Sequence, residues 1–121
     1  MTEERQGQSD VLEDDLQRFA DCWNDERFFD AHETLEPRWI KTRDRGLRGL
    51  IQLAAAFHHL QRGNLVGART TLERAIPRLT DAENAPCAID QSRLAQYAAR
   101  VLTSLEKIPA PEIIESRPRL P

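Results

Sequence analysis

Residues 49–68, with the sequence GLIQLAAAFHHLQRGNLVGA, decide the fold of this chain. They supply most of a helix that we predict from about residue 45 to residue 62, and its apolar residues cover nearly all of its faces. A helix that is apolar all round is buried by its neighbours. Gly63 is expected to end this helix in a left-handed conformation, and Asn64 is expected to cap the next one. The sequence therefore predicts two antiparallel helices, joined by a short turn, at the centre of the molecule.

Apolar residues at helical spacing predict three more helices around this hairpin. The first begins at Asp10, the second covers about residues 27–40, and the last begins after Asp90. Residues 24–26 separate the first two helices and are expected to cap the second. Pro37 lies inside the second helix and predicts a kink or an early end there, because proline has no N–H to donate. We therefore expect an all-α fold, a compact helical array of about five helices.

The chain is short enough for one domain, and its composition sets the limits that we expect for that domain. Residues 1–9 are polar and are expected to be disordered. Residues 10–108 should form the helical domain. Residues 109–121 hold four of the seven prolines and are expected to form a Pro-rich extended tail. Ile113 and Ile114 are the residues that would dock this tail onto the domain.

The formal net charge of −3 gives no overall basic excess, so we expect neither nucleic acid nor a membrane as a partner. The basic run Lys41–Arg48 is interpreted as a solvated loop and helix start, with a phosphate-binding patch as the alternative. The N-terminus lacks a secretory h-region, and no apolar run approaches the length of a membrane span. Cys22 and Cys87 form no CxxC pair and are expected to be reduced core residues. Together these features predict a cytoplasmic protein.

His32 and Glu36 are the first candidates for a functional site. Their spacing of four residues places an imidazole and a carboxylate on one face of a helix. These groups suit a divalent metal such as zinc, iron or manganese. His59, from the central helix, is the tentative third ligand. In a metal-dependent hydrolase, Glu33 would be the natural general base because it directly follows a ligand.

The same residues also have a structural interpretation, which we consider beside the metal site. His32 and Glu36 can bond to each other or to a neighbouring backbone group and so fix one helix against the next. Trp39 is expected to be a core residue or a lid over this pair. Gln52 is polar within an apolar helix, must find partners, and is expected to tie the central helix to the region of His32. A third interpretation makes Trp39 and Gln52 the lining of a small-ligand pocket without metal.

Two linked motifs carry a resemblance to a known family. The first, H-x-x-x-E-x-x-W, is formed by His32, Glu36 and Trp39. The second, a GLIQ-A-A…H…RGN-xx-GA pattern, is formed by residues 49–68. Together they resemble the hallmarks of the domain of unknown function 309 family, over roughly residues 19–79. The resemblance implies a compact all-α fold and a suggestion that the histidine and the glutamate bind metal, but no established activity. Pro37 departs from the family pattern.

Residues 52–79 also look like a single tetratricopeptide-type helix hairpin, although no second copy occurs at a fixed period. No P-loop, dinucleotide or G-x-S-x-G fingerprint points to an enzyme. Three functions therefore remain open. The leading one is a small interaction or scaffold module, which would act as a homo-oligomer or bind a protein partner. The alternatives are a divalent-metal-binding protein that acts as a hydrolase and a small-ligand pocket without metal.

Overall fold

The computed structural model describes residues 2–81 and 89–121, and for residues 2–11 it describes the backbone. The regular elements of these residues are helices, which are α1 (Thr2–Asn24), α2 (Phe28–Thr42), α3 (Arg45–Gln61), α4 (Leu65–Thr80), α5 (Gln91–Ser104) and α6 (Ala110–Glu115). The predicted all-α fold is confirmed. The five predicted helices correspond to α1 to α5, and α6 is an additional short helix near the C-terminus.

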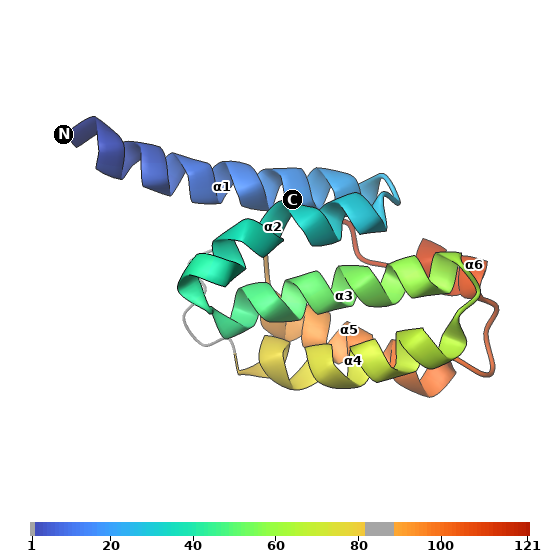
Figure 1. The fold of residues 1–121 in the computed structure, drawn as a ribbon. Helices are drawn as coiled ribbons and strands as arrows, with labels where there is room; N and C mark the ends of the chain where they lie inside the picture. Colours follow the sequence, from blue (N-terminus) through green and yellow to red (C-terminus); the bar gives the residue numbers. More distant parts are fainter. Residues whose placement is uncertain (1, 82–88) are drawn as a thin grey trace.

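The helices α3 and α4 form the central hairpin, and Figure 1 shows them side by side with opposite directions. Gly63 has a φ of 72°, and the Asn64 side chain accepts a hydrogen bond from the Gly67 N–H over 2.9 Å. These are the two features that the sequence predicts for the turn. A Cβ atom at Gly49 would come within 2.9 Å of Cγ of Leu79, so this glycine allows the two helices to approach closely. The antiparallel hairpin is confirmed, and its likeness to a tetratricopeptide unit is approximate.

The other helices pack around this hairpin. α2 and α6 pack on α3, α5 packs on α4, and α1 packs on α2. Four of these helices contribute to one aromatic cluster in the core, formed by Trp23, Phe28, Phe57 and Tyr97. The ring centroids of Trp23 and Phe57 lie 4.8 Å apart, and those of Phe57 and Tyr97 lie 6.1 Å apart. The cluster joins α1, α2, α3 and α5 into a single core, since aromatic side chains bury the largest apolar areas.

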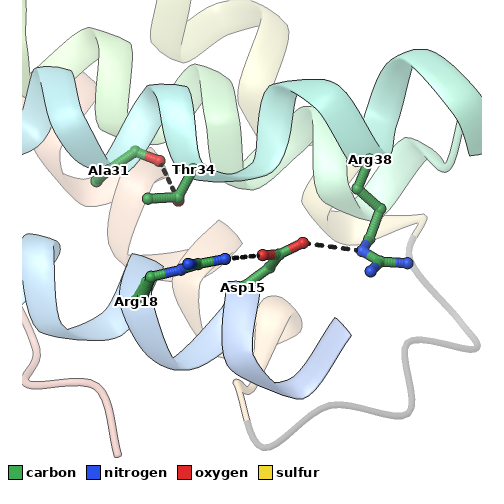
Figure 2. Close-up of polar contacts among 5 residues, drawn as sticks. All are labelled: Asp15, Arg18, Ala31, Thr34 and Arg38. Atoms are coloured by element: carbon green, nitrogen blue, oxygen red, sulfur yellow. Dashed lines mark hydrogen bonds and ion pairs between the residues drawn. The ribbon is translucent and has the colours of Figure 1, made fainter. Parts of the chain in front are cut away.

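An ion pair at the interface of α1 and α2 lies beside this core. Nε of Arg38 lies 3.2 Å from Oδ2 of Asp15, and both side chains are largely buried. Asp15 also pairs with Arg18 on its own helix, so the carboxylate lies between two guanidinium groups (Figure 2). In the same view, the hydroxyl of Thr34 donates to the carbonyl of Ala31 within α2. The pair fixes the position of α2, the helix that carries His32 and Glu36.

The predicted cap of α2 is wrong, and so is one of the two outcomes predicted for Pro37, the early end of the helix. The residue before the helix, Arg27, provides no side-chain cap, and Asn24, which belongs to the predicted capping stretch, bonds instead to the backbone of Leu120. The helix also continues through Pro37 to Thr42 and does not end early. Leu35 is buried before the proline, and Arg38 pairs with Asp15 after it, so tertiary contacts hold the helix on both sides of Pro37. These contacts compensate for the one backbone hydrogen bond that proline cannot make.

The C-terminal segment contains a helix where the sequence predicts an extended tail. Ile113 and Ile114 are buried on α6, which explains why this segment docks onto the domain. Pro118 then accepts a hydrogen bond from Nε1 of Trp23 over 2.8 Å. At the other end of the chain, α1 begins at Thr2, before the start predicted at Asp10. The limits at residues 10 and 108 stay predictions.

Cys22 is buried, as the sequence predicts, whereas Cys87 lies outside the described residues. Burial raises the pKa of the Cys22 thiol, and the carboxylates nearby raise it further, although Arg27 opposes them. A thiol with a raised pKa is a poor nucleophile, which fits a core residue. Among the residues that the structure describes, no helix has the length and apolar character needed to cross a membrane.

Candidate functional site

His32 and Glu36 lie on one face of α2, as their spacing predicts. Nε2 of His32 is 3.8 Å from Oε2 of Glu36, a distance that allows an ion pair when the imidazole is protonated but is too long for a hydrogen bond. The His32 side chain is 27% exposed and that of Glu36 is 41% exposed. Both side chains are therefore partly exposed, and solvent and small ions can reach them.

The other nitrogen of His32 is in a different environment. Its Nδ1 is buried and has no hydrogen-bond partner among the described residues. The imidazole ring lies 5.8 Å from the ring of Phe29, which in turn lies 5.2 Å from the ring of His58 on α3. An unsatisfied buried nitrogen costs about 1–3 kcal/mol unless a water or ligand reaches it. His58 is thus the α3 histidine that packs toward this region, through Phe29.

His59, the predicted third ligand, lies at the turn between α3 and α4. Its Nδ1 is 3.2 Å from Nδ2 of Asn64. Because Oδ1 of Asn64 already accepts the Gly67 N–H, the amide of Asn64 faces His59 with its NH₂ group. Nδ1 of His59 must then accept, which requires the neutral ring. Burial lowers the pKa of His59, and the neighbouring His58 and Arg62 lower it further, consistent with the neutral form.

The three residues predicted as metal ligands are therefore not brought together. Among the side chains of residues 12–81 and 89–121, no three His, Cys, Asp or Glu residues form a group that could hold one metal ion. Consecutive residues on a helix differ by about 100° in direction, so α3 turns His58 toward α2 and His59 toward α4. Glu33 is exposed on α2, next to His32 in the sequence. His32 and Glu36 remain as a pair of metal-ligating side chains.

Gln52 and Trp39 have partners that the sequence does not predict. Oε1 of Gln52 accepts a hydrogen bond from Nη1 of Arg78 over 2.9 Å, so Gln52 ties α3 to α4 and not to the region of His32. The antiparallel register of the hairpin is the signal that could have indicated a partner near the end of α4. Trp39 packs against the core, and the guanidinium groups of Arg43 and Arg48 lie 4.5 and 4.3 Å from its ring centroid.

Comparison with known proteins adds the family context for this geometry. Residues 16–71 match a family model described as Domain of unknown function (DUF309). The resemblance predicted from the two motifs is confirmed over this segment. No curated protein and no solved structure matches the chain.

The DUF309 segment runs from α1 to the first half of α4 and contains both sequence motifs. Around the turn between α3 and α4, the residues His59, Asn64 and Gly67 pack against one another as one unit. A Cβ atom at Gly67 would lie 2.6 Å from Nδ2 of Asn64 and 2.8 Å from Nδ1 of His59. Only glycine leaves room for this pair, so His59, Asn64 and Gly67 depend on one another. This unit accounts structurally for three residues of the second motif.

A cleft outside the DUF309 segment was not predicted from the sequence. It lies between α5 and α6, has a volume of about 440 Å³, and is lined by residues that include Tyr97, Ile108 and Ile113. The hydroxyl of Tyr97 donates toward the carbonyl of Ile113 over 3.1 Å, and burial raises the pKa of this tyrosine. None of the predicted site residues lines this cleft.

Proposed function

We propose that this protein is a helical interaction module that associates with a second copy of itself. Support comes from the partners of the second-motif residues. Gln52 bonds to Arg78, and His59 bonds to Asn64, so these side chains are engaged within the fold. Side chains whose hydrogen-bonding groups are satisfied within the fold mainly stabilise the hairpin and are less available to a ligand.

The surface that favours association is the apolar end, defined by Phe29, Leu65 and Val66. The side chains are 49%, 40% and 78% exposed, respectively. Figure 1 shows the start of α2, the end of α3 and the start of α4 at the same end of the molecule. Phe29 contacts His58 on α3, and the next residue along α3 contacts the first turn of α4. Large apolar residues gathered at one place on a surface are typical of interaction sites.

Sedimentation velocity over a range of protein concentrations tests this proposal. We expect the wild type to form a dimer, and we expect Val66→Asp and Phe29→Ser to shift the equilibrium toward monomer. Ile40→Asp is the matched control, because Ile40 is 56% exposed on α2 but lies about 16 Å along the helix from Phe29. A wild type that stays monomeric at every concentration would contradict self-association. Equal effects of Ile40→Asp and Val66→Asp would contradict the assignment of the surface.

A second candidate function, divalent-metal binding, is favoured by the His32–Glu36 pair. Two ligands at about 2.1 Å from a tetrahedral metal lie roughly 3.4 Å apart, and the observed N···O distance of 3.8 Å is close to this value. Two protein ligands leave the other coordination positions to water or to a substrate. In a hydrolase of this kind, Glu33 would accept the proton from that water.

Isothermal titration with Zn²⁺ and Mn²⁺ separates this candidate from the structural interpretation. If the pair binds metal, His32→Ala and Glu36→Gln should both abolish the binding heat. Glu33→Gln is the matched control, because it should remove only a catalytic base and leave metal binding unchanged. Wild-type protein that gives no binding heat with either ion would exclude the metal site. The pair would then be structural.

A further inference from the structure

The end of the molecule opposite the apolar end carries a concentration of positive charge. Three helix ends meet there, namely the last turn of α2, the first turns of α3 and the last turns of α4 (Figure 1). The hairpin register fixes their neighbours. Nη2 of Arg45 lies 3.0 Å from Oδ2 of Asp81, and Gly49 packs against Leu79. Cationic residues of α3 and α4 are therefore brought together by the packing of the hairpin, although the sequence separates them widely.

We define the basic end as Lys41, Arg43, Arg48, Arg74 and Arg78. Among the described residues, none of these five has a carboxylate partner within ion-pair distance, whereas the nearby Arg45 is paired with Asp81. The whole chain has a formal net charge of −3, so this excess is local. Burial lowers the pKa of Arg78, and the like charges of Arg48, Arg45 and Arg74 lower it further.

Contacts with neutral groups position three arginines of the basic end, Arg43, Arg48 and Arg78. Nη1 of Arg78 donates to Oε1 of Gln52 and to the carbonyl of Arg74, over 2.9 and 3.0 Å. Arg43 and Arg48 lie against the ring of Trp39. These partners orient the guanidinium groups without neutralising their charge. Planar guanidinium groups that are held in place, and that have no carboxylate partner among the described residues, match the bidentate geometry of phosphate oxygens.

We propose that the basic end binds a small polyphosphate, a ligand with two or more linked phosphate groups. A single phosphate cannot contact all the guanidinium groups that α3 and α4 bring together. A second, linked phosphate would bind those that the first leaves free. A long nucleic acid is disfavoured, because the whole chain carries a net negative charge. The Trp39 ring already contacts two guanidinium groups, and these reduce the area on which a base could stack.

Titration calorimetry with tripolyphosphate at low ionic strength tests the proposal. We expect wild-type protein to bind it with an affinity that falls as salt is added. The double variant Arg48→Gln/Arg74→Gln should weaken binding by about a hundredfold, since each lost charge-assisted contact costs roughly tenfold. Both side chains lie at the surface of their helices, and circular dichroism confirms that the variant is folded. Arg78→Lys, which keeps the charge and loses the planar fork, should also weaken binding.

Arg62→Gln is the matched control, because Arg62 lies at the other end of α3 and its removal changes the net charge by the same amount as each single substitution. Its affinity for tripolyphosphate should equal that of the wild type. The proposal is overturned if wild-type protein does not bind tripolyphosphate, or if Arg62→Gln weakens binding as much as Arg48→Gln does. Tighter binding of a single-stranded RNA oligonucleotide through the same arginines would also overturn it, in favour of a nucleic-acid surface.

Discussion

The side-chain amide of Asn64 donates a hydrogen bond to Nδ1 of His59, over 3.2 Å. Asn64 accepts the capping bond of α4 with its oxygen, and its nitrogen is thereby directed at the imidazole. The last turn of α3 and the first turn of α4 are joined through this one amide. Gly67 completes the unit, because any larger residue would occupy the space of the pair.

We predict that Gly67→Ala destabilises the protein, although alanine normally favours a helix. The new Cβ would lie 2.6 Å from Nδ2 of Asn64 and would displace the pair. Overpacking of this kind costs about 1–3 kcal/mol, and urea denaturation measures it. Gly63→Ala is an informative comparison, since it meets no atom within 4 Å and acts only through its φ of 72°. Unchanged or greater stability of Gly67→Ala would contradict the packing.

The stability of the protein should depend on pH through His59. The folded pKa of His59 is lowered, so the unfolded state binds a proton more readily. The stabilising contribution is therefore complete above the unfolded pKa of about 6.5 and is lost as the pH falls through the folded pKa. Urea denaturation across this range should show the decline, and His59→Gln should reduce it. The prediction fails if His58→Gln reduces the decline and His59→Gln does not.

The ion pair between Asp15 and Arg38 should contribute more to stability than the pair between Asp15 and Arg18. The Arg38 side chain is 20% exposed, whereas that of Arg18 is 64% exposed, and solvent screens the second pair. Double-mutant cycles with Asp15→Asn measure both couplings. We expect about 1 kcal/mol for Arg38→Gln and less than about half of that for Arg18→Gln. Equal couplings would show that burial at the interface of α1 and α2 has no effect on the pair.

Arg117 should stabilise the docked C-terminal segment. Its guanidinium donates to the carbonyls of Trp23, Asn24 and Ile114, over 3.0, 2.6 and 2.8 Å. A cation at a helix C-terminus satisfies free carbonyls and interacts favourably with the helix dipole. Arg117→Ala should lower the free energy of unfolding by about 2 kcal/mol, measured by denaturation. Arg119→Ala, at an exposed position two residues away, should have little effect, and a loss of equal size there would argue against this role.

The local elements of the fold could be predicted because their causes lie within a few residues. The apolar residues of α3 predict a buried helix, and Gly63 and Asn64 predict its end and the next cap. Asp90 likewise accepts a hydrogen bond from the N–H of Arg93 at the start of α5, as its position predicts. Capping groups and helix periodicity act over three or four residues, so a single sequence contains the whole signal.

The candidate site was predicted only in part, for a related reason. The His32–Glu36 pair follows from helix geometry and is present on α2. The position of His59 relative to this pair could not be predicted, because which of His58 and His59 faces α2 depends on how α3 is rotated against its neighbours. A helix that is apolar all round gives no periodic signal for that rotation. His58 packs toward α2, and His59 bonds to Asn64 on the other side.

The sequence by itself therefore determined the presence of helices α1 to α5, the hairpin turn, and the placement of His32 and Glu36 on one helix face. The tertiary structure alone decided which residues became partners across long stretches of chain. It paired Gln52 with Arg78, directed Asn24 to Leu120 and gathered the cations of the basic end. The physical reason is that such contacts depend on how buried helix faces pack, and many pairings of polar groups are compatible with the same local pattern.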